Sequence, residues 1–244
     1  MSRWKGRGAK AVAEAAPLSG LYDEIRRWPA RLECALSASG GTLVANCQQA
    51  RLLCATGFGS DVLSTPDRRG DGEDLATTHV FQLMLEEVFY LSYELDCLRV
   101  HRQSSQGRVD LTLEQLWCLM QEFNREFVKM YKAYSHLRNK RWVVRPGPQY
   151  GADFMAYRHH PTLVHSDYAV LVIPADDPQS RLASWTDVQG MTRLCGSVAK
   201  TLLVLYIIVD MGHDLSSPTY LERITVEEVE VRRWLPQKHR EDSQ

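Results

Sequence analysis

Two continuous apolar runs in the second half of the chain constrain its fold most. They cover residues 168–173 and 202–209 and are rich in Val, Ile and Leu. Runs of this length without alternating polar residues are typical of strands buried on both faces. Between them, Ser184 and Asp187 have the spacing of a helix start, in which the serine caps the helix. We therefore expect a helix that runs through about Lys200, between two buried strands of one sheet.

Weaker strand patterns surround these two runs. Residues 142–145 and 154–157 are short apolar segments, with a Pro-Gly-Pro turn signal between them. Residues 224–234 carry apolar side chains along a further strand-like stretch, and residues 158–164 are predicted to be a loop. The second half is therefore predicted to be a compact mixed sheet with a helix between two of its strands.

The first half shows mainly helical patterns. In residues 79–98, apolar side chains recur at steps of three and four, which predicts one amphipathic helix. A second helix is expected to begin at Thr112, because Gln115 completes a capping box. A third is expected over about residues 123–140. Residues 60–78 contain Gly, Pro and mixed charges without an apolar period, which indicates an exposed loop.

The end of the third helix is basic, and two interpretations of it stay open. Positive side chains are favoured at a helix C-terminus by the macrodipole, and such side chains can also contact RNA. The residues are Lys129, Lys132, Arg138, Lys140 and Arg141.

The composition restricts the possible classes of protein. Of 244 residues, 44% are hydrophobic and 24% charged, which is ordinary for a folded soluble protein. The formal net charge is -1, so an overall basic field gives no argument for nucleic-acid binding. The six cysteines include no C-x-x-C pair; we expect buried, reduced thiols and no zinc site. No apolar run approaches the roughly 20 residues of a membrane span.

The first 17 residues form a basic stretch. Arg3, Lys5, Arg7 and Lys10 precede the first acid, Glu14. Three roles suit such a stretch: a nuclear-localisation arm, a tail that contacts RNA, or a solvated start without regular structure. We expect residues 1–17 to be a flexible arm.

Three side chains at the ends of predicted elements are suited to proton transfer and to stabilising an anion. Tyr157 ends a strand, His165 precedes the next strand, and Lys200 lies where the last helix meets a strand. Cleavage of RNA by its own 2′-hydroxyl needs a base, an acid for the leaving 5′-oxygen and a cation for the phosphorane, but no metal. Each residue taken alone is more often structural, so the pattern of the three does not decide the function.

Longer sequence blocks carry a resemblance to a known family. Residues 150–157 resemble a "(F/Y)GxDFxxY" block, residues 165–170 a "H(S/A)xYxV" block, and residues 193–200 an "RxxxxxxK" helix ahead of a buried strand. These blocks, in this order, are those of the catalytic subunits of the tRNA-splicing endonuclease.

The resemblance extends over about residues 80–235. Residues 82–93 are similar to the "LxLxEAFFLSYxL" helix of the eukaryotic catalytic subunit assigned to the 5′ splice site. Residues 131–142 and 223–234 resemble two further helix and strand blocks of the family. Residues 1–79 resemble it only faintly.

The resemblance implies a function and a site. It implies a metal-independent endoribonuclease without cofactors that cuts precursor tRNA at an intron junction and leaves a 2′,3′-cyclic phosphate and a 5′-hydroxyl. Tyr157 would be the general base, His165 the general acid and Lys200 the group that stabilises the transition state. Arg193 and Trp234 fall where the family holds a bulged base between a guanidinium and a ring; alternatively, that pair serves the site of the partner catalytic subunit.

One departure from the family pattern lies between the base and the acid. The family usually has a Gly-Pro-Pro-like loop there, whereas this chain has Arg158, His159, His160 and Pro161 and lacks the glycine. Loop contacts with RNA are therefore expected to differ. We expect both histidines to be solvated loop residues.

The fold class that follows is α/β (α+β): a small mixed-sheet nuclease domain preceded by a mainly helical α/β N-terminal domain. The predicted parts are the arm, an N-terminal domain over residues 18–122, a catalytic domain over residues 123–238 and a tail over residues 239–244.

The family enzyme is a four-subunit assembly with a second catalytic subunit and two structural ones, so we expect those partners and precursor tRNA. The resemblance implies a nuclear location, with other compartments as the alternative because some members of the family act elsewhere. The apolar last strand is a candidate pairing edge. Two alternatives are a non-catalytic structural subunit of the same complex and a related nuclease in other RNA processing. The absence of an Asp…Glu-x-Lys pattern beside Asp153 and Asp167 disfavours a metal-dependent nuclease.

Overall fold

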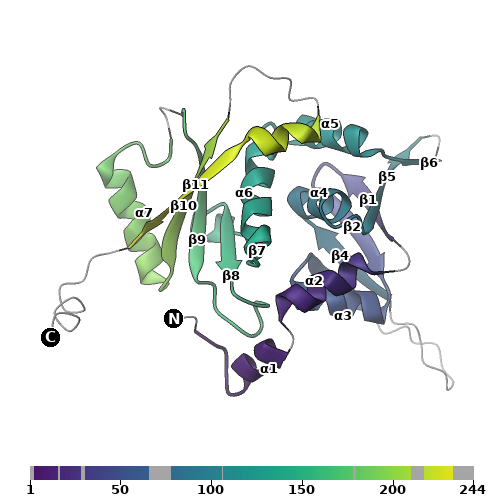
Figure 1. The fold of residues 1–244 in the computed structure, drawn as a ribbon, viewed down its shortest axis with the longest axis horizontal. Coiled ribbons are helices and arrows are strands. Elements are labelled where there is room, and N and C mark those ends of the chain that lie inside the picture. Colours follow the sequence, from purple (N-terminus) through teal and green to yellow (C-terminus); the bar gives the residue numbers. More distant parts are fainter. Residues whose placement is uncertain are drawn as a thin grey trace.

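Two mixed β-sheets and the helices between and around them form the molecule (Figure 1). The structure is a computed structural model that describes residues 3–15, 17–28, 31–65, 78–105, 107–177, 180–209 and 217–232. Helix α4 packs on the first sheet, α6 packs on the second, and the two helices pack against each other. The α+β class predicted from the sequence is confirmed.

The first sheet has six strands in the order β3-β4-β2-β1-β5-β6. Only the β1–β5 pair is parallel. The strands are β1 (Leu32–Ser37), β2 (Gly40–Ala45), β3 (Ser60–Thr65), β4 (Thr78–Leu83), β5 (Leu98–Ser104) and β6 (Gly107–Asp110). The sequence predicts helices and a loop in most of this half, with only weak strand or short-helix signals at residues 43–45 and 52–54, so most of this sheet was not predicted.

The predicted helix over residues 79–98 was wrong at its start. Strand β4 ends at Leu83, and helix α4 covers only Leu85–Tyr93. Phe81 and Leu83 are buried while their neighbours are not, which is the two-residue period of a strand. Glu87 then fixes the helix start, because its carboxylate accepts a hydrogen bond from the backbone N–H of Met84 at 2.9 Å.

The predicted exposed loop is partly a strand, and the other helices follow the predictions more closely. Residues 60–65 form β3, and residues 66–77 lie outside the described part of the chain. Helix α5 (Leu113–Phe123) has the predicted capping box, with hydrogen bonds in both directions between Thr112 and Gln115. Helix α6 (Phe127–Asn139) begins four residues later than predicted.

The second sheet has five strands in the order β11-β10-β9-β8-β7. Its central pair, β9 and β10, is parallel and is joined by helix α7 (Trp185–Ser197), as the two apolar runs predicted. The other pairs are antiparallel. The strands are β7 (Val143–Pro146), β8 (Phe154–Tyr157), β9 (Tyr168–Pro174), β10 (Thr201–Ile208) and β11 (Thr225–Val231).

Aromatic side chains fill the layer between the sheets. Phe89 on α4 lies 5.2 Å from Trp117, 5.8 Å from Phe127 and 4.8 Å from Tyr131, measured between ring centroids. All four rings are almost completely buried. Such pairs add specific geometry to the free energy of apolar burial, so they fix α4, α5 and α6 relative to one another.

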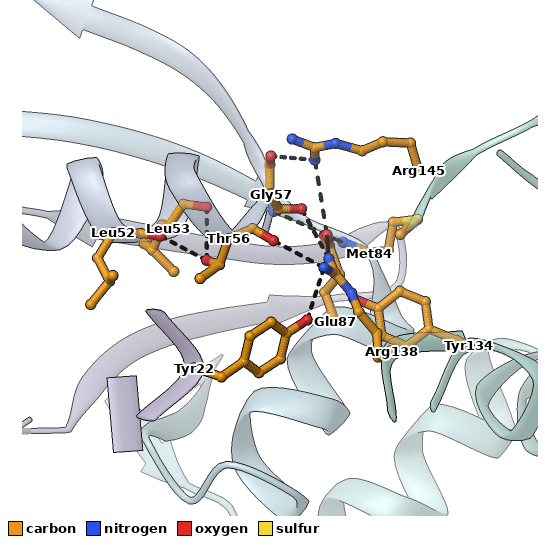
Figure 2. A network of polar contacts seen from close by, with 11 residues as sticks. Tyr22, Leu52, Leu53, Thr56, Gly57, Met84, Glu87, Tyr134, Arg138 and Arg145 are labelled. Atoms are coloured by element: carbon orange, nitrogen blue, oxygen red, sulfur yellow. Dashed lines mark hydrogen bonds and ion pairs between the residues drawn. The ribbon is translucent and has the colours of Figure 1, made fainter. Parts of the chain in front are cut away.

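A buried guanidinium connects this layer to the end of helix α3 (Cys47–Thr56) (Figure 2). Arg138 on α6 has no solvent exposure; it donates hydrogen bonds to the carbonyl oxygens of Thr56 and Gly57 and to the hydroxyls of Tyr22 and Tyr134. Its Nη2 lies 3.7 Å from a carboxylate oxygen of Glu87. Arg138 lies in the last turn of α6, in agreement with the helix-end interpretation, whereas its complete burial contradicts the RNA-contact interpretation for this residue.

Residues before the first sheet also have regular structure. Helices α1 (Ala9–Ala15) and α2 (Leu18–Arg26) precede β1, and α3 (Cys47–Thr56) follows β2. Trp4 forms an isolated bridge with Val164 in the catalytic half. Residues 3–15, predicted to be flexible, therefore contain a helix and a tertiary contact.

The cysteines differ in exposure. Cys34, Cys97 and Cys195 are buried as expected, whereas Cys47 and Cys118 are exposed. Burial raises the pKa of the Cys34 thiol to about 12. Within the described ranges, no helix has the length and apolar character needed to cross a membrane.

Candidate active site

The topology of the second sheet brings three candidate residues to one of its ends. Tyr157 is the last residue of β8, which runs antiparallel to β9. His165 precedes the start of β9, and Lys200 directly precedes the start of β10, which is parallel to β9. The end of β8 and the starts of β9 and β10 therefore lie side by side. They form one edge of the sheet at its strand ends, rather than along an outermost strand. The backbone N–H of Thr201 donates a hydrogen bond to the backbone carbonyl oxygen of Asp167, with 3.0 Å between nitrogen and oxygen, and this bond holds the last two segments together.

Tyr157 is half-buried at this edge. Burial raises the pKa of its phenol, and Tyr150 raises it further, while a hydrogen bond with Ser166 and the charge of Arg145 lower it. Ser166 is buried next to His165 in the sequence. The Ser166 hydroxyl thus couples the candidate base to the segment that carries the candidate acid, a contact that sequence reasoning missed.

His165 is exposed at the end of the loop between β8 and β9. Desolvation lowers the pKa of its imidazole, and the charges of Lys5, Lys200 and Arg3 lower it further. Lys200 is thus an electrostatic neighbour of His165, as an acid beside an anion-stabilising cation requires. The imidazole is a better proton donor when nearby cations disfavour its charged form.

A strained turn sets the position of Lys200. The backbone N–H of Lys200 donates a hydrogen bond to the carbonyl oxygen of Cys195, and that of Ala199 donates to the carbonyl oxygen of Gly196. This is the hydrogen-bond pattern of a Schellman motif at the end of α7. Ala199 has φ +53°, in the left-handed region that favours glycine. Desolvation and Arg3 lower the pKa of the Lys200 amine, which Asp167 raises.

The loop between Tyr157 and His165 differs from the expectation for its two histidines. His159 is buried rather than solvated, and His160 is partly buried. Desolvation and the charge of Arg145 lower the pKa of His160 to about 4, so it is neutral at neutral pH. Its Nδ1 lies 2.7 Å from the hydroxyl of Thr162, a contact that stabilises the loop.

The two predicted RNA-binding residues are Arg193 and Trp234. Arg193 is exposed on α7, and Trp234 lies outside the described residues. Asp153 accepts hydrogen bonds from Arg181 and from the backbone N–H of Val172. Asp167 forms an ion pair with Arg158 at 3.0 Å. Within the described residues, no group of three or more His, Cys, Asp or Glu side chains is arranged to hold a metal ion.

Comparison with known proteins adds the family. Residues 127–216 match the model of the tRNA intron endonuclease catalytic C-terminal domain, and this segment contains the edge described above. A chain with this domain and this edge is of the RNA-cleaving class.

Similar proteins extend the match to nearly the full chain. The tRNA-splicing endonuclease subunit Sen2-1 of Arabidopsis thaliana is 43% identical over 98% of this chain and 97% of its own length. A probable subunit Sen2 of Oryza sativa is 40% identical over 98% and 82%. Subunit Sen2 of Mus musculus is 33% identical over 66% and 36%. The chain belongs to the tRNA-splicing endonuclease subunit Sen2 family.

Proposed function

We propose that this chain is a catalytic subunit that cuts precursor tRNA at the 5′ splice junction without a metal ion. The observation that carries the proposal is the convergence of Tyr157, His165 and Lys200 at one edge of the second sheet. The similarity to Sen2 subunits and the likeness of residues 82–93 to the 5′-site subunit support the choice of junction.

The chemistry is transesterification within the RNA. Tyr157, in its phenolate form, accepts the proton of the 2′-hydroxyl and becomes a neutral phenol, and the 2′-oxygen attacks the adjacent phosphorus. The bond from phosphorus to the 5′-oxygen breaks, and His165 donates a proton to that oxygen. Lys200 offsets the additional negative charge on the phosphorane oxygens. The products are a 2′,3′-cyclic phosphate and a 5′-hydroxyl.

The proposed assembly contains a second catalytic subunit and two structural subunits, and its proposed location is the nucleus. Imaging of the tagged chain in intact cells tests the location, and a cytoplasmic signal alone would contradict it. The pairing edge is β11, whose Val229 side chain is 44% exposed. The alternative of a purely structural subunit predicts that the three residues at the sheet edge are idle.

The deciding experiment is cleavage of an intron-containing precursor tRNA by the co-expressed complex in EDTA. His165→Ala is compared with the wild type and with His101→Ala, which removes a histidine from the other sheet. We expect His165→Ala to abolish the 5′ cut and spare the 3′ cut, while His101→Ala spares both. End-group analysis is expected to detect the cyclic phosphate. If both cuts survive His165→Ala, the structural-subunit alternative is correct; if EDTA stops cleavage, the metal-free mechanism is wrong.

A further inference from the structure

Residues 3–5 lie antiparallel to residues 163–165, directly beside the candidate acid. The backbone N–H of Lys5 donates a hydrogen bond to the backbone carbonyl oxygen of Leu163 at 2.8 Å, and the backbone N–H of His165 donates to the carbonyl oxygen of Arg3 at 3.0 Å. The Lys5 amine also donates to the carbonyl oxygen of Pro161 at 2.7 Å. Figure 1 shows the start of the described chain, in purple, close to the connection between β8 and β9.

The geometry of this pair sorts the side chains onto two faces. Trp4 and Val164 are opposite each other, and side chains alternate along paired extended segments. Val164 is fully buried, so Trp4 faces inward, where it lines a cavity of about 590 Å³ with Trp142 and other residues. Arg3 and His165 are the next pair of opposite residues, so their side chains lie on the outer face. In agreement with this, residues 3, 5 and 165 are all exposed.

Positive charge accumulates on this outer face. Arg3 and Lys5 lower the pKa of both His165 and Lys200, so four basic groups lie within electrostatic reach of one another. The carboxylate of Asp167 raises the pKa of Lys200, but it also pairs with Arg158. Backbone hydrogen bonds hold like charges close together here, which costs free energy until an anion binds.

We propose that Arg3 and Lys5 are part of the substrate-binding surface and hold RNA phosphates that flank the cleaved one. This inference rests on the proposed function, because it takes the edge with His165 and Lys200 as the cleavage site. A guanidinium and an ammonium on a pre-organised backbone segment are the groups that bind phosphate oxygens and fix the register of a nucleic acid. The segment thereby links the start of the chain to a site formed by residues far away in sequence.

The test compares two double variants in the co-expressed complex. Arg3→Gln/Lys5→Gln removes the two charges at the edge, and Arg7→Gln/Lys10→Gln removes two exposed charges from the same part of the chain. Precursor tRNA affinity is measured against salt concentration, together with single-turnover cleavage at each junction. Losing two phosphate contacts to single-stranded RNA is expected to lower the slope of log K against log salt by about 1.4, so the affinity lost between about 50 and 200 mM salt shrinks roughly sevenfold.

A charge-preserving variant separates binding from loop support. Arg3→Gln/Lys5→Gln is expected to slow the 5′ cut as well as lower the salt slope. Arg3→Lys/Lys5→Arg keeps both positive charges on the same paired backbone and is expected to restore both. The inference is overturned if Arg3→Gln/Lys5→Gln has the same salt slope as Arg7→Gln/Lys10→Gln. It is also overturned if the charge-preserving variant Arg3→Lys/Lys5→Arg fails to restore cleavage. If His165→Ala has no effect on cleavage, the proposed function fails instead, whatever the salt slope.

Discussion

Ala199 stores strain at the turn that carries Lys200. Its φ of +53° lies in a region that costs a residue with a Cβ about 1 kcal/mol, and glycine avoids most of that cost. Ala199→Gly is expected to raise the melting temperature by roughly 2–4 °C. Ala11→Gly, inside helix α1, is the control and is expected to lower stability by about 1 kcal/mol. Thermal unfolding measures both, and a destabilised Ala199→Gly would contradict the strained turn.

The pKa of His165 predicts a direction for the pH dependence of cleavage. An acid must be protonated, so activity falls as pH rises through its pKa, which lies below its ordinary value of 6.5. Lys5 is one cause, and Lys5→Gln is expected to raise the pKa and move the alkaline limb of kcat/KM to higher pH. Arg7→Gln is the control and is expected to leave the limb in place. A limb that moves to lower pH in Lys5→Gln would exclude His165 as the acid.

Single residues also show which parts of the candidate site can be proposed from the sequence and which cannot. Tyr157, His165 and Lys200 follow from sequence blocks, because strand ends and block order are local properties. The hydrogen bond between Tyr157 and Ser166 and the pairing of residues 3–5 with the His165 segment join distant elements. The basic stretch was visible, but its partner was not, since no local pattern encodes a single antiparallel bridge.

At the scale of elements, helix α6 depends on one buried charge. Arg138→Met keeps the volume but removes the nearer of the two cations beside the buried Glu87 carboxylate, since Arg145 lies 3.9 Å away, and it removes the donor to two carbonyl oxygens. We expect a loss of about 3–5 kcal/mol in the free energy of unfolding. Glu87→Gln in the same chain is expected to recover part of that loss, because the buried negative charge that lost its nearer cation disappears.

The exposed Arg26 provides the matched control for that measurement. It makes one long hydrogen bond of 3.4 Å to the carbonyl oxygen of Glu94, so Arg26→Met is expected to change stability by less than about 0.5 kcal/mol. Chemical denaturation of all four chains is the measurement. An Arg138→Met variant as stable as Arg26→Met would mean that the network in Figure 2 contributes no net stability.

Elements were predicted best where burial is greatest. Strands β9 and β10 are buried on both faces, so their unbroken apolar runs mark them clearly. Strand β1 has only Leu32, Cys34 and Leu36 on its buried face, alternating with Glu, Ala and Ser, and β5 has only Leu98 and Val100. Two or three apolar residues at period two are too few to distinguish a strand without its neighbours, and the first sheet was therefore missed.

At the scale of the whole molecule, the two sheets have outermost strands of different lengths. Strand β11 forms one edge of the second sheet, with Val229 exposed and paired only with β10 among the described residues. Strand β6 forms an edge of the first sheet, with Val109 48% exposed. Both present unpaired backbone groups, but β11 has seven residues and β6 only four, and a long edge is the better template for a partner strand.

The proposed assembly therefore predicts different effects for one substitution at the two edges. Val229→Lys is expected to weaken association with the partner subunits at least tenfold, because a charge enters a surface buried on assembly. Val109→Lys is expected to leave association unchanged. Co-purification and sedimentation of the co-expressed complex measure the result, and equal melting temperatures for the two isolated chains exclude misfolding as the cause. Strand β11 belongs to the sheet whose strand ends carry Tyr157, His165 and Lys200, so loss of the partners through Val229→Lys should also reduce cleavage. If both variants associate equally well with the partner subunits, the subunit interface does not lie at β11.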